Sequence, residues 1–309
     1  MKTQSTTKAT VITLAILTGT LLAGCGQEFD PPSLIAGTRV LGAVVQVEGD
    51  EARATPQPGE AAIVTWIVAT PGAVPPLGWA FVVCPAGPDT DEAPCAASPL
   101  ATAQGTAAPQ FRLMVPPAEM LGDASRLTIV GQICEEGMPT FDPQTGMPAC
   151  PGAGTTVTVD VRLQRAADAN HNPALAARPL WLDGAILPVD DGTLDCASLP
   201  AVAVGSKEHV IRLATLAEDR EPIVTSAADP EAVQTPTREM LQISTFTTDG
   251  ELGQTYAFIP ADDGNPESDI EIKWDAPDFV PADGRVRFYF VARDLRGGVG
   301  VTARTVCVQ

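Results

Sequence analysis

Alternation of apolar and polar residues is the clearest pattern along this chain, and it predicts β-strands. In TTVTVDVRL, residues 155–163, apolar side chains occupy every second position: Val157, Val159, Val161 and Leu163. A period of two is typical of a half-buried antiparallel strand. RLTIVGQI repeats the pattern through Leu127, Ile129 and Ile133.

Three earlier segments are β-rich but more uniformly apolar: RVLGAVVQV (39–47), AAIVTWIVA (61–69) and GWAFVVC (78–84). Turn-forming clusters such as TPQPGE and TPGAVPPLG separate them, and no amphipathic helical pattern lies between them. Short strands at close spacing indicate a β-sandwich over residues 38–165.

The C-terminal part repeats this style. SDIEIKWD, GRVRFYFVARD and REMLQIS place apolar residues at alternate positions: Leu241, Ile243, Ile270, Ile272, Trp274, Val286, Phe288 and Phe290. GVGVTARTVCV follows the turn DLRGG and places Val301, Ala303 and Cys307 on one face, which predicts a closing hairpin. Residues 206–309 are therefore predicted to form a second sandwich of roughly 100 residues, the usual size of an immunoglobulin-like unit.

Residues 166–205 are predicted to be an ordered connector. Within them LWLDGAIL reads as a tight hairpin, because Asp183-Gly184 supplies the positive φ angles of a type I′ turn. The predicted fold class is thus all-β, with two immunoglobulin-like antiparallel β-sandwich domains.

The first 24 residues have the composition of a signal peptide. Lys2 and Lys8 precede an apolar stretch, residues 9–23, that is shorter than the roughly 20 residues of a membrane-spanning helix. The stretch ends Leu-Ala-Gly-Cys, which resembles the lipobox of bacterial lipoproteins. That resemblance implies cleavage before Cys25 and acylation of Cys25, which would make residues 25–37 a lipidated tether. The alternative is an ordinary signal peptide beside an unrelated cysteine.

The tether between Cys25 and Arg39 is about 13 residues long and reaches at most about 45 Å. Gly26 follows the cysteine where inner-membrane lipoproteins often carry Asp, so we expect an outer membrane lipoprotein, on either the periplasmic or the surface-exposed face.

Charge narrows the classes of partner. The chain has a net charge of −19, and removing residues 1–24 removes two lysines and no acid, which leaves −21. Such a surface repels nucleic acid and anionic lipid headgroups. We therefore expect no nucleic-acid partner and membrane attachment through the lipid.

Six cysteines remain when Cys25 is set aside, an even number that suggests three disulfides in an exported protein. Fifteen pairings are formally open. Pairing of nearest neighbours gives Cys84–Cys95, Cys134–Cys150 and Cys196–Cys307. A zinc site is disfavoured because the chain has no C-x₂-C and only two histidines, His171 and His209.

The candidate metal site is calcium at DANHN, where Asp168, Asn170 and Asn172 alternate as at the start of an EF-hand loop. Pro173 occupies the position of the loop glycine, so a capped turn is the alternative. Otherwise no cofactor is expected.

Carboxylate pairs and histidines are the candidates for catalysis. Asp190/Asp191 and Asp262/Asp263 each precede glycine in a predicted loop and could serve a hydrolase or simply cap turns. No catalytic motif surrounds His171 or His209, although a Ser-His-Asp site is not excluded.

Tryptophans are the candidates for carbohydrate stacking. Trp66 and Trp274 lie within predicted strands and are expected in the core, whereas Trp79 and Trp181 lie nearer turns and are the better candidates for an exposed platform.

Several motifs together, FDPPSLIAGTRVLGAVV, NHNPAL, LDG and IKWDAP…GRVRFYFVARDLRGGVG, resemble a group of uncharacterised lipoproteins from high-GC Gram-negative bacteria. The C-terminal hairpin also resembles the last strands of immunoglobulin-like and PKD-like domains. The resemblance implies a fold and a location and carries no catalytic residue. We therefore expect a lipid-anchored cell-envelope protein that acts as a non-enzymatic binding or scaffold module for an envelope protein or polysaccharide. A calcium-dependent adhesive or carbohydrate-binding module, or a hydrolase, is the alternative.

Overall fold

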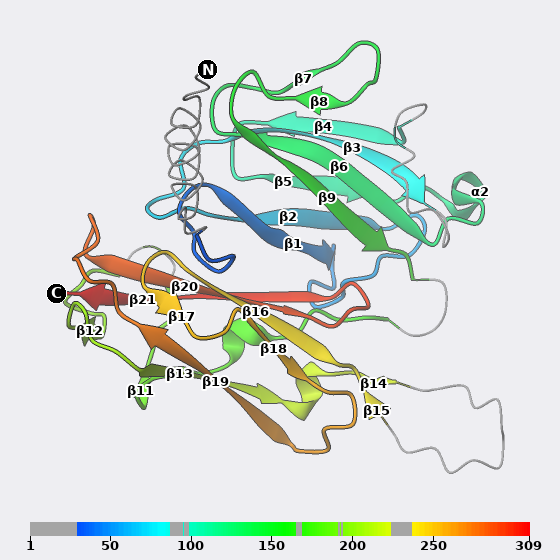
Figure 1. Cartoon of the computed structure of the whole chain (residues 1–309). Coiled ribbons are helices and arrows are strands. Elements are labelled where there is room, and N and C mark those ends of the chain that lie inside the picture. Colours follow the sequence, from blue (N-terminus) through cyan, green and yellow to red (C-terminus); the bar gives the residue numbers. More distant parts are fainter. Residues whose placement is uncertain are drawn as a thin grey trace, which may run out of the picture. The chain divides into compact units, whose positions relative to one another are not determined.

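The structure is a computed structural model that describes residues 30–86, 95, 99–164, 169–190, 192, 194–223 and 237–309 (Figure 1). Residues Ser33–Gln309 form one compact unit. Its sheets are antiparallel apart from one short parallel pair, and the predicted all-β sandwich architecture is confirmed.

The N-terminal half contains a three-stranded and a four-stranded sheet, of order β1-β2-β5 and β4-β3-β6-β9. The strands are β1 Arg39–Val47, β2 Ala61–Ala69, β3 Gly78–Ala86, β4 Ala101–Gly105, β5 Gln110–Met114, β6 Arg126–Cys134 and β9 Gly154–Arg162. A two-stranded ribbon, β7 Thr140–Phe141 and β8 Pro148–Ala149, and a short helix, α2 Ala118–Leu121, complete it.

One hydrophobic core fills the space between these two sheets. The predicted inward residues of β6 are buried, as are Val157, Val161 and Leu163 of β9 and the loop after it. Trp66 is buried as predicted, and its ring stacks on Phe81 with centroids 3.9 Å apart. Stacked aromatic rings add to the free energy gained by burying their area.

Disulfides explain why β3 is apolar on both faces. The predicted pairs Cys84–Cys95 and Cys134–Cys150 are formed in the structure. On the outer face of the sheet, Val82 and Val130 form a small buried cluster with Cys84 and Cys95, and Phe141 of the β7–β8 ribbon packs against it. Cys95 and the β7–β8 ribbon thus help to bury this face of the sheet.

The C-terminal half contains two five-stranded sheets, of order β11-β10-β13-β19-β17 and β12-β21-β20-β16-β18. The first comprises β10 Leu180–Leu182, β11 Ala185–Ile186, β13 His209–Leu216, β17 Glu251–Leu252 and β19 Glu267–Asp275. The second comprises β12 Ala201–Val202, β16 Leu241–Thr247, β18 Tyr256–Ile259, β20 Arg285–Arg293 and β21 Val299–Val308. The short elements are β14 Pro222–Ile223, β15 Thr237–Arg238 and the 3-10 helices η2 Leu175–Ala177 and η3 Ala217–Asp219.

The predicted inward residues of this half are buried, including Trp274 at 0% exposure. The segment expected to be a connector is part of this sandwich. Its hairpin forms as predicted, with positive φ at Asp183 and Gly184, but β10 pairs with β13 and β12 runs parallel to β21. The Cys196–Cys307 disulfide, also as predicted, joins this segment to β21.

The two halves meet through the outer faces of β1–β2 and β16–β20–β21. Leu41 and Ala69 are buried there against Val291, with Val301 packed beside them. A bulge in β1 between Val40 and Gly42 interrupts the alternation of its side chains, so Leu41 packs into the interface although Ala43, two residues later, packs into the N-terminal core.

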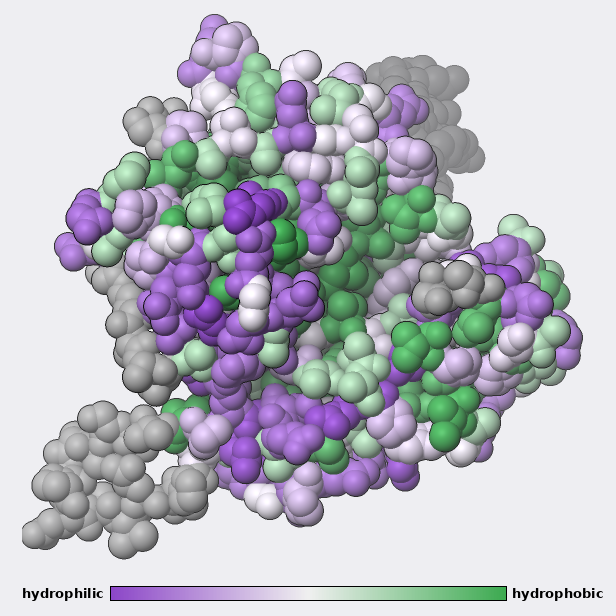
Figure 2. Space-filling view, turned by 180° about the vertical axis from the view of Figure 1, so that it is seen from behind, coloured by the Kyte–Doolittle hydropathy of each residue, from purple (hydrophilic) through white to green (hydrophobic). Residues whose placement is uncertain are grey.

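Hydrophobic residues reach the surface at several places among hydrophilic ones, as Figure 2 shows for one face. Such mixing is ordinary for folded proteins. Within the described part of the chain, no helix has the length and apolar character needed to span a bilayer.

Candidate functional site

The chain joins the fold earlier than the sequence suggested. Cys25 lies outside the described residues, but Ser33 and Ile35 already bond to the end of β16. The Thr247 N–H donates to the Ser33 carbonyl at 2.9 Å, and the Ile35 N–H donates to the Thr247 carbonyl at 2.8 Å. Residues 33–37, expected to belong to the tether, are therefore fixed to the folded unit.

The two asparagines of the predicted calcium motif are used within the fold, while Asp168 lies outside the described residues. The Asn172 amide donates to the Val45 carbonyl at 2.8 Å and its oxygen accepts from the Val299 N–H at 2.9 Å. The Asn170 amide donates to Asp294 Oδ2 at 2.8 Å. Asn172 therefore links β1 to β21, which is a structural role. Among described residues, no three His, Cys, Asp or Glu side chains group as metal ligands would.

The predicted carboxylate pairs lie in different turns. Asp190 accepts from the Gly192 N–H and the Thr305 hydroxyl. Asp263 accepts from the Asn265 N–H and the Ser268 hydroxyl, which lowers its pKa below the usual range. Asp262 is exposed, and Asp191 lies outside the described residues. These bonds are those of turn-capping side chains.

Neither tryptophan proposed for an exposed platform lies free on the surface. Trp79 is 6% exposed, and its indole N–H donates to the Ala107 carbonyl at 3.1 Å, so this candidate does not provide an exposed platform. Trp181 is half-buried, and the Arg212 guanidinium lies 4.2 Å from its ring centroid.

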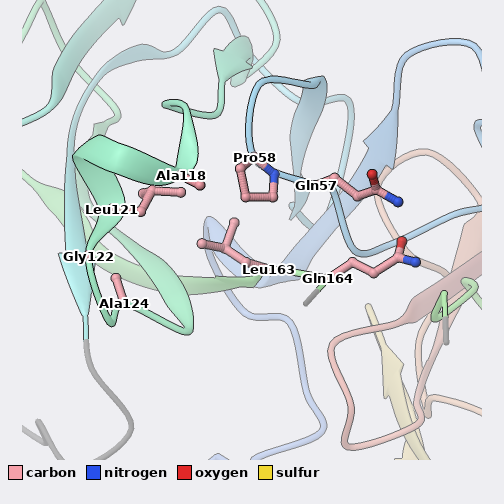
Figure 3. Close-up of a pocket in the computed structure, with 8 residues that line it drawn as sticks. All are labelled: Gln57, Pro58, Ala118, Leu121, Gly122, Ala124, Leu163 and Gln164. Atoms are coloured by element: carbon pink, nitrogen blue, oxygen red, sulfur yellow. The ribbon is translucent and has the colours of Figure 1, made fainter. Parts of the chain in front are cut away.

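A hollow of about 490 Å³ lies at one end of the N-terminal sandwich (Figure 3). Leu121 and Leu163 form buried parts of its wall, and Pro58 of the β1–β2 loop faces them. The side chains of Gln57 and Gln164 extend in one direction beside it. The side-chain oxygen Oε1 of Gln164 accepts a hydrogen bond from the Arg53 guanidinium at 3.1 Å. None of the described side chains that line this distal pocket is titratable, which suits it to binding an uncharged group.

A second hollow, of about 310 Å³, lies where the chain enters the fold. Leu34 lines it together with Phe279, whose side chain is 83% exposed. Four carboxylates also line it, Asp249, Glu251, Asp275 and Asp278, with Lys207 as the one base among these side chains. The excess of carboxylates makes this entry hollow negatively charged, which disfavours the binding of anions.

Beside the entry hollow, Ser206, His209 and Asp183 form a chain of hydrogen bonds. Ser206 Oγ lies 2.7 Å from His209 Nε2, and His209 Nδ1 lies 2.7 Å from Asp183 Oδ2. The other oxygen of Asp183 accepts from the Val210 N–H at 2.9 Å. Partial burial works to raise the pKa of Asp183, but the bonds from His209 and Val210 prevail and the pKa lies below its usual value.

Sequence reasoning singled out His209 and the Asp183 turn separately and missed their contact. Pairing of β10 with β13 brings the turn over His209, since Leu182 lies opposite Ile211. Only the register of that pairing could have revealed the arrangement.

A buried charged network surrounds the β20–β21 turn. Asp294 accepts from the backbone N–H groups of Arg296, Gly297 and Gly298. Arg296 pairs with Glu221 at 3.2 Å and with the buried Glu239 at 2.5 Å. Glu221 also contacts His171. Burial, and then the charge of Asp294, raise the pKa of Glu239 to about 7. Perturbed carboxylates mark functional sites, but also structural ion-pair networks.

Comparison with known proteins assigns no function to this chain, so a functional proposal rests on the geometry described above. No protein-family model matches the sequence, and a search of curated proteins finds no match.

Proposed function

We propose that this protein is a lipid-anchored cell-envelope module, held at the outer membrane through Cys25, that binds a protein partner at its distal pocket. The course of β1 carries the proposal. The chain enters the fold at Ser33, and β1 then runs for nine residues to the loop that supplies Gln57 and Pro58. Nine strand residues span about 30 Å, so the distal pocket lies at the far end of β1 from the point of attachment.

The tether in this proposal is short. Eight residue steps separate Cys25 from Ser33, and eight steps reach at most about 29 Å. An anchored protein would keep its entry hollow near the bilayer and present its distal pocket away from it. Three disulfides support an oxidising location for the folded chain.

The chemistry of the distal pocket favours an uncharged peptide segment as the bound group. Its wall is apolar and two carboxamides lie beside it. Carboxamides donate and accept hydrogen bonds as peptide groups do. No aromatic side chain, on which a sugar ring would stack, is among the described residues that line it. This composition favours a protein partner over a polysaccharide.

The anchor is tested by expressing the full chain in a Gram-negative host with an alkyne-labelled fatty acid. We expect the protein to carry label and to sediment with outer membranes. The Cys25→Ala variant should lose the label and become soluble after release from the cell. An unlabelled wild-type protein would refute the anchor.

The binding surface is tested separately with a photo-crosslinking amino acid at Gln57, with the exposed Gln254 between β17 and β18, in the other half of the protein, as the matched control position. We expect a discrete protein adduct from position 57 that weakens when Ala118→Arg places a charge at an exposed position of the pocket wall. Adducts of equal yield from both positions would refute the distal pocket as the site.

A further inference from the structure

We propose that Ser206 and His209 form a nucleophile and general base that hydrolyse carboxylic esters, with Asp183 positioning the histidine. The geometry carries this inference. A Ser Oγ within hydrogen-bond reach of one imidazole nitrogen, and a carboxylate on the other nitrogen, is the arrangement that activates a serine hydroxyl. Both distances here are 2.7 Å.

The Asp183 carboxylate fixes the tautomer of His209. Because its Oδ2 can only accept, the neutral ring carries its proton on Nδ1 and leaves Nε2 free to accept the proton of Ser206. The ring is held further by Trp274, with centroids 5.5 Å apart. The side chain of His209 is 16% exposed, so the base is shielded but accessible.

The backbone of this site is conformationally unusual. Among described residues other than glycine, three have positive φ, and two of them are Asp183 and Glu208. Glutamate rarely adopts this conformation, and such residues cluster at active sites. Glu208, with its positive φ, lies between Ser206 and His209 in the chain. It is part of the tight turn that brings the Ser206 hydroxyl back to the ring of His209.

The entry hollow adjoins the serine and limits the substrate class. Lys207 and Ala276 line the hollow, and the Ala276 N–H donates to the Ser206 carbonyl at 2.9 Å. The Lys207 N–H makes no hydrogen bond to another described residue, and the residue after a nucleophilic serine commonly supplies an oxyanion donor. The four carboxylates of the hollow repel anionic esters, so the substrates are neutral or cationic carboxylic esters.

The reaction balances without a cofactor. Ser206 Oγ attacks the ester carbonyl carbon while its proton passes to His209 Nε2, and the ester C–O bond then breaks as that proton goes to the leaving alcohol. Water next attacks the acyl-serine with His209 as base, which releases the carboxylic acid and restores the hydroxyl. In the structure the Ser206 hydroxyl also donates to the Ala203 carbonyl at 2.5 Å. Because the hydroxyl has a single proton, it must turn that proton from Ala203 to His209 Nε2 before the attack.

This activity goes beyond the binding function proposed above and departs from the expectation of a purely non-enzymatic module. Its test does not depend on the lipid or on a partner. The purified, oxidised full chain is treated with a fluorophosphonate probe, and peptide mass spectrometry locates the label. Hydrolysis of neutral p-nitrophenyl acetate and butyrate is followed in parallel.

We expect label on Ser206, and a loss of at least about 100-fold in ester hydrolysis for Ser206→Ala and His209→Gln. Asp183→Asn should lower kcat and displace the pH profile, which a purely structural role would not do. Ser198→Ala is the matched control, because Ser198 donates to Asp195 without a histidine.

The inference is overturned if folded wild-type protein leaves Ser206 unlabelled, or if Ser206→Ala, with an unchanged Tm, hydrolyses the esters as fast as wild type. Labelling of the His209→Gln variant at the wild-type rate would also overturn it. Each outcome is independent of whether Cys25 is acylated or the distal pocket binds a partner.

Discussion

Glu239→Gln should stabilise the protein at alkaline pH and not at acidic pH. Glu239 lies between β15 and β16 with 1% exposure, and Arg296 is the one cation that bonds to it among the described residues. The carboxylates of Asp294 and Glu221 face the same group and raise its pKa further, whereas the Glu221 N–H and Arg296 lower it. The result is a folded-state pKa of about 7, above the ordinary value of 4.5.

The sign follows from proton binding. Between pH 4.5 and 7, Glu239 is ionised in the unfolded chain but protonated in the folded chain, so the free energy of unfolding falls as pH rises. The loss is complete above pH 7. A difference of about 2.5 pKa units corresponds to about 3 kcal/mol at pH 8, and to less than about 1 kcal/mol at pH 5.

Glutamine has nearly the same shape as glutamate and carries no charge, so the Glu239→Gln variant does not lose free energy of unfolding as this site ionises. A carboxamide has one acceptor oxygen where the carboxylate has two, so one of the two bonds accepted from Arg296 and the Glu221 N–H would be lost, at a cost of about 1 kcal/mol at either pH. The difference between variant and wild type should therefore change by about 2.5 kcal/mol in favour of the variant from pH 5 to pH 8.

Urea unfolding with intact disulfides, followed by tryptophan fluorescence at both pH values, measures this change. Glu251→Gln, which removes an exposed carboxylate of β17, controls for the altered net charge. An equal effect of Glu239→Gln at the two pH values, or a greater destabilisation at pH 8, would refute the reasoning.

Two further predictions concern the asparagine motif. Asn172→Leu should destabilise the protein by about 2–3 kcal/mol in urea unfolding, because it leaves the Val45 carbonyl and the Val299 N–H without partners. Asn265→Leu, at an exposed position, is the control. Equal destabilisation by the two substitutions would contradict the linking role of Asn172. Since the Asn172 oxygen already accepts a protein hydrogen bond, we expect EDTA and millimolar calcium to leave the Tm unchanged. A rise of several degrees with calcium would show a bound ion instead.

The strands were predictable because burial on one face leaves a period of two in the sequence. Segments such as ESDIEIKWD and TTVTVDVRL record which residues face the core. Those residues are buried in β19 and β9, except Val159, which is partly buried and packs against the core. The disulfide pairing was also predictable, since short separations of 11 and 16 residues account for two pairs and leave one.

Trp79 shows where local pattern fails. It follows a proline-rich turn and looked exposed, but β4 covers it. Its ring lies so close to Gly105 that a Cβ at that glycine would lie 2.4 Å from a ring carbon. β4, ATAQG, is too short and too polar for periodicity to reveal it. Gly105 of β4, which lies over the Trp79 ring, is 26 residues away in the sequence, so only folding brings the two residues together.

The same reason explains why His209 and the Asp183 turn were noted separately and Ser206 was not singled out. A turn aspartate, a strand-initiating histidine and a serine are each ordinary in sequence. They meet because the hairpin predicted as a connector adds β10 to the edge of β13, so that Asp183 bonds both the ring and the backbone of the first residues of that strand. A long-range register is not recorded in either segment alone.

The interface between the halves gives both proposals their geometry. Arg293 of β20 donates to the Leu41 carbonyl at 2.6 Å and to Ser244 at 3.1 Å, while Asn172 joins β1 to the start of β21. These bonds accompany the buried contact of Leu41 with Val291. β1 is thus fixed along its length to the half that holds Ser33 and the entry hollow. The separation between the entry hollow and the distal pocket is consequently set by a strand and not by a flexible linker, so a ligand held at one end lies at a defined distance from Ser206 at the other.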